Sequence, residues 1–461
     1  MRTVDTDYLV VGAGTAGMGF VDTVLAASDR EVVMVDRRPG PGGHWLEGYP
    51  FLRLHLPSDF YGVESMPLPS SAVVQSTGPE AGWFERGSGA EVCAYFDDVM
   101  RRRLLPSGRV RFLPRTEHLG GGRVRSLLSG KVTEVRVREA VVDATRNGAT
   151  VPESSPPPFE VADGARCVTP TGLTRLCERP AGYVVIGSGK TAMDTCGWLL
   201  EQGADPDAIA WIRPRDTWAL DRRYFQPAHL RLDAVEGTAL QVEAAAAADT
   251  ANHAFLQLER DGVMMRLDTD VLPTMFRAPS LSRHEAEVLR SIRRVVRRGY
   301  VRRIGADRIL LAGGEIPTSR ATVHVHCAAP GLPTERPGPV FADDVITLQL
   351  ITRYNASLSV AMIGRVACTD LPLAEKNRLC ASMPVLAGTP EAFFPLFLSG
   401  LVTEAAWRDH PELQTWLRAT RLNTTGRTPD GTGDDDMRRM GARVAAAMPA
   451  ALARLAVWGG G

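Results

Sequence analysis

Closely spaced cysteines are absent from this sequence. Its seven cysteines are scattered, with no C-x-x-C or C-x-x-x-x-C pair among them: Cys93, Cys167, Cys177, Cys196, Cys327, Cys368 and Cys380. Redox chemistry that uses two neighbouring thiols is therefore excluded by that route. An odd, dispersed set is typical of reduced packing cysteines, so we expect a cytoplasmic protein.

A net charge and a long apolar run are also missing. Lysine and arginine together number 53, as do aspartate and glutamate, so no overall field favours nucleic acid or an anionic membrane. We find no run that approaches a membrane span and no signal-like N-terminus, and we expect a soluble chain with no nucleic-acid or membrane partner. Lysine is scarce, being confined to Lys131, Lys190 and Lys376. The 461 residues, 44% of them apolar, are enough for two or three globular domains.

A glycine-rich motif, GAGTAG, follows the apolar residues 8–11, and apolar residues then recur at helical spacing. This pattern predicts a strand, a tight turn and a helix whose N-terminal N–H groups face a pyrophosphate. A second predicted strand, 32–35, ends in Asp36, where a carboxylate accepts both ribose hydroxyls. The motif therefore predicts a dinucleotide site. The residues that we expect to bind this cofactor are Gly12, Gly14, Thr15, Ala16, Gly17, Asp36 and Arg37.

A second glycine-rich motif, GSGKTA, repeats the design after residues 183–186. The strand that follows, 209–212, ends in arginines rather than in a carboxylate, and guanidinium groups there suit a 2′-phosphate. We therefore predict FAD at the first site and NADPH at the second. The motif is not a P-loop, because that loop needs a glycine where Val184 stands. The residues that we expect to bind NADPH are Gly187, Gly189, Lys190, Thr191, Arg213 and Arg215.

The predicted fold class is α/β, with two Rossmann-like dinucleotide-binding domains, a helical insertion and a helical C-terminal region. The predicted organisation is 1–165 for the first part of the FAD domain, 166–305 for the NADPH domain with a helical insertion at 226–298, 306–390 for the second part of the FAD domain, and 391–461 for the helical C-terminal region. Residues 308–311 and 321–327 are expected to be strands that return to the FAD sheet.

Two clusters of polar residues have ordinary structural explanations. The arginines between residues 290 and 303 alternate with Leu289, Ile292 and Val296, so we interpret them as the solvated face of an amphipathic helix and not as a polyanion site. His324 and His326 share one strand face. Without a third ligand at a recognisable spacing, we predict no metal site there.

The residues after Asp36 resemble the flavin-facing segment of the class B flavoprotein monooxygenases. Gly42-Gly43-His44-Trp45 matches a GG-x-W motif, and Tyr49-Pro50, Arg53, Ser58 and Tyr61 follow in the order of the Baeyer-Villiger branch. Residues 211–218 are similar to the flavin-containing monooxygenase segment that holds the NADPH 2′-phosphate, and residues 361–364 to a flavin-domain strand. The resemblance spans roughly residues 5–220 and, less clearly, 300–370.

This resemblance implies that NADPH reduces FAD and that molecular oxygen then adds to the flavin as a C4a-peroxide or hydroperoxide, which oxygenates a small organic substrate. It places Gly43, His44 and Trp45 at the flavin, with His55 and Ser58 as the catalytic candidates. His55 stands where the Baeyer-Villiger pattern has an aspartate, and a histidine there would exchange a proton near neutral pH. The alternative is that His44 and His55 are merely hydrogen-bonded loop residues.

Two other hypotheses stay open. The family fingerprint F-x-G-x-x-x-H has no counterpart between Ala165 and Gly182, and the family's A-T-G reads Cys327-Ala328-Ala329. These departures favour an NADPH-dependent FAD reductase or dehydrogenase without oxygenation. A flavin-binding protein retained only for interaction is a third class, which the two intact glycine loops disfavour. The sequence indicates neither the substrate nor the oligomeric state, and we expect segments 226–298 and 391–457 to line the substrate cavity.

Overall fold

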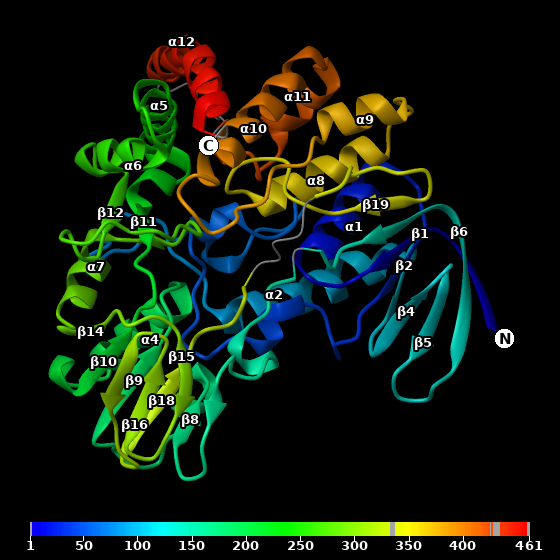
Figure 1. Ribbon diagram of the computed structural model, residues 1–461. Coiled ribbons are helices and arrows are strands. Elements are labelled where there is room, and N and C mark those ends of the chain that lie inside the picture. The colour runs from blue at the N-terminus through cyan, green and yellow to red at the C-terminus, as the bar shows by residue number, and fades with distance from the viewer. Residues whose placement is uncertain (1, 147, 332–336, 425, 427–433, 459–461) are drawn as a thin grey trace.

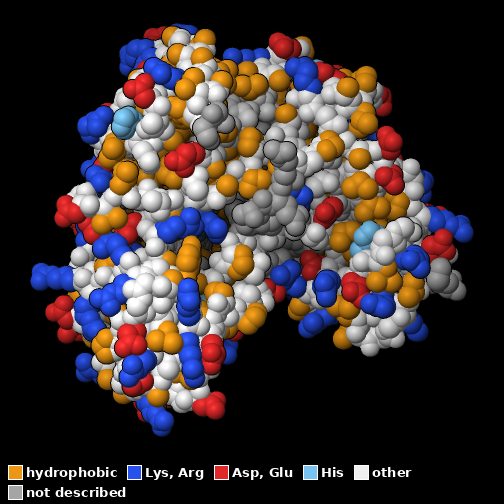
Figure 2. Space-filling model, viewed as in Figure 1, with side chains coloured by type: hydrophobic (Ala, Val, Ile, Leu, Met, Phe, Trp, Pro, Cys, Tyr) orange, Lys and Arg blue, Asp and Glu red, His pale blue; other side chains and the backbone are white. Residues whose placement is uncertain are grey.

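The chain forms two sheet-based lobes beneath a layer of helices (Figure 1). This computed structural model describes residues 2–146, 148–331, 337–424, 426 and 434–458. The first lobe holds the N-terminal strands, and the second holds the strands of the middle of the chain. A notch separates the two lobes on the side away from the helices (Figure 2).

The first lobe is built on a seven-stranded sheet of order β3-β2-β1-β6-β5-β4, with β19 paired to β6. The strands are β1 (Arg2–Val11), β2 (Val32–Val35), β3 (Val110–Leu113), β4 (Thr116–Gly120), β5 (Arg123–Ser126), β6 (Val132–Asp143) and β19 (Val345–Thr347). Strands β3, β2, β1, β6 and β19 run parallel. Their carboxyl ends therefore share one edge, where ligands of parallel sheets bind. Helices α1 (Thr15–Ala27) and α8 (Ala356–Ala367) pack together on this sheet, where an added Cβ on Gly19 would lie 2.8 Å from Val360.

The second lobe has a parallel five-stranded sheet of order β14-β10-β9-β18-β8. Its strands are β14 (Arg294–Val296), β10 (Ile209–Ile212), β9 (Gly182–Ile186), β18 (Thr322–His326) and β8 (Arg166–Val168). Helix α4 (Lys190–Glu201) and α7 (Arg283–Arg290) cover one face. The other face packs on a small sheet made of β7 (Glu160–Val161), β15 (Val301–Ile304), β16 (Arg308–Leu311) and β17 (Gly314–Pro317).

Two strands that the sequence assigned to the FAD sheet belong to the second lobe instead. Residues 308–311 form β16, the middle of a β15-β16-β17 antiparallel meander. Residues 322–326 form β18, which lies between β9 and β8. Only β19 returns to the first sheet after this point in the described chain. Alternating burial shows that a segment is a strand but not which sheet it joins, so the prediction was wrong about the partner.

Two further sequence predictions are corrected. Residues 361–364 are not a strand but lie inside α8, which is buried on almost every side, and such a segment shows no helical period. The arginines between 290 and 303 do not share one helix: α7 ends at Arg290, Arg294 begins β14, and Arg302 lies in β15. Charged residues that alternate with apolar ones suit an edge strand as well as a helix, so the pattern was misread.

The helical layer combines the predicted insertion with the C-terminal region. It contains α5 (Arg231–Ala247), α6 (Ala251–Arg260), α9 (Leu373–Leu379), α10 (Phe393–Ala406), α11 (Pro411–Ala419) and α12 (Asp434–Trp458). Short strands β11 (Trp218–Asp221), β12 (Met264–Arg266) and β13 (Ser280–Leu281) join it to the second lobe. Phe255, Phe276, Phe393 and Phe394 form its aromatic core, with ring centroids 5.0–5.6 Å apart in edge-on arrangements.

Helix α12 overturns the expectation that no run approaches a membrane span. Residues Asp435–Trp458 are long and apolar enough by composition, with a mean hydropathy of 1.3 over an 18-residue window that is 11% buried. The helix packs along α5, and Arg443 forms two 2.7 Å hydrogen bonds to Glu243. This run was missed in the sequence because many of its apolar residues are alanines rather than residues with large side chains.

Candidate functional site

The first glycine loop joins β1 to α1 with almost no space between strand and helix. Gly12 has φ of 110°, a conformation that favours glycine. A Cβ on Gly17 would lie 2.0 Å from the carbonyl oxygen of Gly12. Gly14 is the N-cap of α1, and Gly43 faces it so closely that a Cβ on Gly14 would lie 3.3 Å from the Gly43 Cα. Thr15 and Ala16 follow in the first turn of α1, so the backbone N–H groups of this turn are available to an anion.

Asp36 stands at the carboxyl end of β2 and is held by the loop itself. Its Oδ2 accepts the backbone N–H of Ala13 at 2.7 Å, and its Oδ1 accepts that of Arg38 at 2.8 Å. The side chain is 6% exposed. A carboxylate has about four lone-pair sites, so both oxygens keep acceptor capacity. Arg37 is exposed beside it.

The GG-x-W residues form a short 3-10 helix, Gly43–Glu47, against the first glycine loop. The rings of His44 and Trp45 stack with centroids 5.6 Å apart. Burial lowers the pKa of His44, and the nearby Arg38 lowers it further, so this imidazole is neutral at neutral pH. Trp45 packs on the core of the first lobe.

The second glycine loop repeats the geometry between β9 and α4. Gly187 has φ of 138°, and a Cβ there would lie 3.1 Å from the carbonyl oxygen of Cys327. Gly189 is the N-cap of α4, with open space where its Cβ would be. The buried hydroxyl of Ser188 has no hydrogen-bond partner among the described residues. An orphaned buried hydroxyl inside an open glycine loop is what a polar ligand would satisfy.

Arg213 lies at the carboxyl end of β10, at the position that corresponds to Asp36 in the first unit. The side chain is 4% exposed, its guanidinium lies 4.8 Å from the centroid of the Trp211 ring, and it pairs with Asp216 at 3.3 Å. Burial lowers its pKa, and Asp216 partly offsets this. Its buried Nε has no partner in the described chain. Arg215, two residues further along the chain, is partly exposed.

Lys190 and Thr191 begin α4, and Lys190 forms an ion pair with Asp194 one turn later. Asp194 also accepts the hydroxyl of Tyr49 from the first lobe at 2.7 Å. Burial raises the pKa of Tyr49, and the charge of Asp194 raises it further, so the phenol keeps its proton and donates it. This contact joins the two lobes at the boundary between them.

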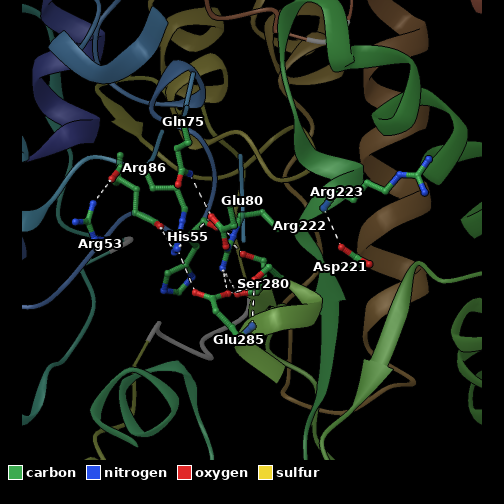
Figure 3. Close-up of polar contacts among 12 residues, drawn as sticks. Arg53, His55, Gln75, Glu80, Arg86, Asp221, Arg222, Arg223, Ser280 and Glu285 are labelled. Atoms are coloured by element: carbon green, nitrogen blue, oxygen red, sulfur yellow. Dashed lines mark hydrogen bonds and ion pairs between the residues drawn. The ribbon is translucent and has the colours of Figure 1, made fainter. Parts of the chain in front are cut away.

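His55 lies at the centre of a charged network at this boundary (Figure 3). Its carbonyl oxygen accepts the Arg222 Nε at 3.1 Å and the Ser280 hydroxyl at 2.5 Å. Arg222 is 1% exposed and forms ion pairs with Glu80 and Glu285. Burial alone would raise the pKa of Glu285, but Arg222, Lys190 and Arg86 outweigh it and lower the pKa.

Burial and the nearby cations together set the charge of the His55 ring. Burial lowers its pKa to about 4, with Lys190 as the next contribution in the same direction. His55 is therefore neutral at neutral pH. The expectation that it exchanges a proton near neutral pH was wrong, because the sequence shows neither the burial of this ring nor the cations that surround it.

Ser58 does not face the protein surface. It is fully buried, its hydroxyl lies 2.7 Å from that of Ser70, and it accepts the backbone N–H of Gly87 at 2.7 Å. Ser70 in turn donates to Glu91 at 2.6 Å. The Ser58 hydroxyl is thus used within the protein, where it fixes the loop that carries His55.

A cavity of about 300 Å³ lies where the helical layer meets the first lobe. Its walls come from α5, from α10 and α11, and from the segment before α8. This agrees with the expectation that segments 226–298 and 391–457 line a cavity. The sequence did not indicate the part played by residues 352–355, or by Arg222, Glu80 and Glu285. Asp194, four residues after Lys190 on a helix, is the one partner that spacing alone indicates.

Known proteins resemble this chain in sequence and in fold. No family model matches the sequence. The chain is 41% identical over 426 residues to the uncharacterised proteins Rv2000 of Mycobacterium tuberculosis and Mb2023 of Mycobacterium bovis, which covers 92% of this chain and 78% of each relative.

Solved structures share the fold at low identity. Cyclohexanone monooxygenase from Rhodococcus sp. Phi1 bound to NADP+ is 15% identical, with a TM-score of 0.53 over 97% of this chain and 98% of that one. Steroid monooxygenase bound to NADP is 15% identical, with a TM-score of 0.52 over 88% and 99%. The chain therefore belongs to the family of these mycobacterial proteins, and its fold is that of the class B flavoprotein monooxygenases.

Proposed function

We propose that this protein is an FAD- and NADPH-dependent monooxygenase that oxygenates a small organic substrate. The observation that carries the proposal is the pair of glycine loops. Each opens at the carboxyl edge of a parallel sheet, and Tyr49 and Asp194 join the two units. We also keep the two Rossmann-like domains and a cytoplasmic location as proposals.

The residues of the first loop fit FAD. The absence of side chains at Gly12, Gly14 and Gly43 leaves a backbone-lined cradle that a Cβ would narrow. Pyrophosphate oxygens there would accept N–H groups from the first turn of α1, and Asp36 would accept the ribose hydroxyls. Trp45 lies beside this cradle and supplies an apolar surface for the ring system.

The residues of the second loop fit NADPH. The orphaned Ser188 hydroxyl and the orphaned Arg213 Nε are both hydrogen-bonding groups that a phosphorylated ligand satisfies. Asp216 pairs with Arg213 and Arg297. Asp268 pairs with Arg297 as well. With Arg215, the residue before Asp216, three guanidinium groups stand against two carboxylates. A net positive site after the second strand favours NADPH over NADH.

When bound, NADPH supplies a hydride and FAD passes the electrons to molecular oxygen, so that one oxygen atom enters the substrate and the other leaves as water. The protein's own contribution is positioning and proton control. Neutral His55 offers one N–H donor and one acceptor nitrogen without adding charge. Arg222 fixes the backbone of His55, and Lys190 forms an ion pair with Asp194.

The experiment is anaerobic reduction followed by exposure to oxygen. We expect the purified protein to carry FAD, and NADPH to bleach its visible absorption faster than NADH does. After oxygen is admitted, a monooxygenase should recover its absorption slowly and release hydrogen peroxide late. Heavy-isotope oxygen should enter a substrate once one is found. Protein that contains no flavin, or flavin that NADPH does not reduce, would refute the proposal.

An NADPH-dependent FAD reductase or dehydrogenase remains the second candidate. It is favoured by the segment that precedes the second loop, β8 with α3 (Pro170–Leu173), which lacks the histidine of the family fingerprint. This candidate predicts immediate recovery of flavin absorption with prompt release of peroxide. The same oxygen experiment therefore separates the two.

A further inference from the structure

The cavity under the helical layer lies at the end of the first lobe where a flavin ring would point. In the first sheet, β2 with Asp36 is on one side of the glycine loop, and β6, β19 and α8 are on the other. A dinucleotide held by Asp36 and by the first turn of α1 would therefore extend away from β2 and toward α8, which follows β19 in the chain and packs against α1. Asn355, the N-cap of α8, lines the cavity.

The charge on the cavity wall is positive. Glu404 is its one carboxylate among the described residues, and it already accepts Arg353 at 3.0 Å and the hydroxyl of Thr352. Arg408 and Arg418 also line the cavity, both are exposed, and neither has an ion-pair or hydrogen-bond partner in the described part of the chain. Two guanidinium groups are thus left to bind an anion.

The rest of the wall suits an apolar ring. Phe60, Tyr224, Phe225, Tyr354 and Trp407 all contribute to it. Tyr354 is held in the left-handed region with φ of 53°, while its hydroxyl donates to Gln241 at 2.9 Å and its ring meets Phe225 edge-on at 5.0 Å. A strained non-glycine backbone persists where surrounding contacts over-determine it, and such residues cluster at ligand sites.

We propose that this cavity is the substrate site and that it selects a small ring-containing carboxylic acid, whose carboxylate meets Arg408 and Arg418 while its ring lies among the aromatic side chains. The inference rests on the proposed monooxygenase function. The cavity volume of about 300 Å³ is at the lower end of ligand pockets, which excludes large substrates.

The test is calorimetric titration of the purified, flavin-containing protein with two matched pairs of ligands: phenylacetate against phenylacetamide, and cyclohexanecarboxylate against its amide. We expect each acid to bind at least about tenfold more tightly than its amide, because the amide loses a charge-assisted contact. In the double variant Arg408→Glu and Arg418→Glu, this preference should disappear. Arg293→Glu, an exposed arginine far from the cavity wall, is the matched control and should keep it.

Equal affinity for acid and amide, an acid preference that survives the double variant, or no binding of either ligand would each overturn the proposal. Circular dichroism and thermal melting of the variants report whether they fold. The two proposals fail separately: an acid preference in protein that NADPH does not reduce would keep the anion site and reject the monooxygenase.

Discussion

At the scale of the residue, the two units differ most at the position that follows their second strand. Asp36 brings a carboxylate there in the first unit, and Arg213 brings a guanidinium in the second. Both side chains are buried and fixed by neighbours, so neither adapts easily to the other nucleotide. In the proposed assignment, the choice of cofactor at each site therefore depends on one charge.

Replacement of Arg213 by alanine should lower kcat/KM for NADPH by about tenfold or more, because a charge-assisted phosphate contact is lost. The corresponding value for NADH should change little. Steady-state kinetics of flavin reduction with both nucleotides measures this. Arg293→Ala is the control, and an equal loss with NADPH and NADH would contradict the assignment.

Gly14→Val should abolish retention of FAD. The branched side chain would enter the space between Gly14 and Gly43, where a Cβ already lies 3.3 Å from the Gly43 Cα. The ratio of flavin to protein absorption measures the effect. Gly40→Val is the matched control, since a Cβ on Gly40 meets no atom within 4 Å. A fully yellow Gly14→Val protein would show that FAD binds elsewhere.

His55 should make stability depend on pH. Its pKa is about 4 in the folded protein and 6.5 ordinarily, so between these values the unfolded chain binds a proton that the folded one does not. This contribution to stability is complete above pH 6.5 and is lost as the pH falls toward 4. The melting temperature of His55→Gln should therefore fall less over this range than that of the unchanged protein. His253→Gln, on the exposed side of α6, is the control. If the melting temperatures of His55→Gln and of the unchanged protein fall in parallel, the lowered pKa of His55 is contradicted.

At the scale of the element, α8 links the first sheet to the C-terminal region through its N-cap. The Oδ1 of Asn355 accepts the N–H of Leu358 at 2.8 Å, and its Nδ2 donates to the carbonyl of Leu422 at 2.8 Å. One side chain therefore ends the preceding loop, begins the helix and holds a segment 67 residues away.

Asn355→Ala should lower the free energy of unfolding by about 2 kcal/mol, since it removes a cap and leaves a buried carbonyl unpaired. Asn355→Ser should recover part of this loss, because serine restores the cap but does not reach Leu422. Denaturant unfolding of the three proteins measures the series. Equal stability of the alanine and serine variants would show that the cap contributes nothing.

At the scale of the whole molecule, specific side-chain contacts join the two lobes. Tyr49 bonds to Asp194, and the ring of Phe51 stacks on Trp198 of α4 at 4.9 Å. The Arg222 network adds a third connection, from the loop of His55 to β13 and α7. The position of the second glycine loop relative to the first depends on these contacts.

Tyr49→Phe should therefore increase amide hydrogen exchange in residues 187–194 by about tenfold, the effect of losing one hydrogen bond to a charged group. Exchange within β1 and β6 should not change. Tyr183→Phe is the control, because the Tyr183 hydroxyl has no hydrogen-bond partner among the described residues. Unchanged exchange in α4 would mean that the aromatic stack and the Arg222 network hold this helix in place without the Tyr49 hydroxyl.

The correct sequence predictions concern local patterns, and the incorrect sheet assignments concern contacts between distant segments. The strands before both glycine loops and the helices after them are predicted correctly, because each pattern lies within about one strand-turn-helix unit. The binding roles of Asp36 and Arg213 stay predictions. The sheets joined by β16 and β18 were assigned wrongly. Strand β18 pairs with segments more than a hundred residues away, as in the alignment of His326 with Ile186. Strand β16 pairs with its neighbours in the chain, but the sheet that this meander packs on is likewise built from distant strands.

The sequence by itself determined the two loops, since glycine placement and strand ends are set by local sterics that adjacent residues carry. Tertiary structure alone decided the charge of His55, the engagement of Ser58 and the cavity beneath the helices. Arg222 meets Glu80 across 142 residues and Glu285 across 63. Electrostatic effects act through space, so a pKa or a cavity wall is fixed only when the folded chain has brought such distant side chains together.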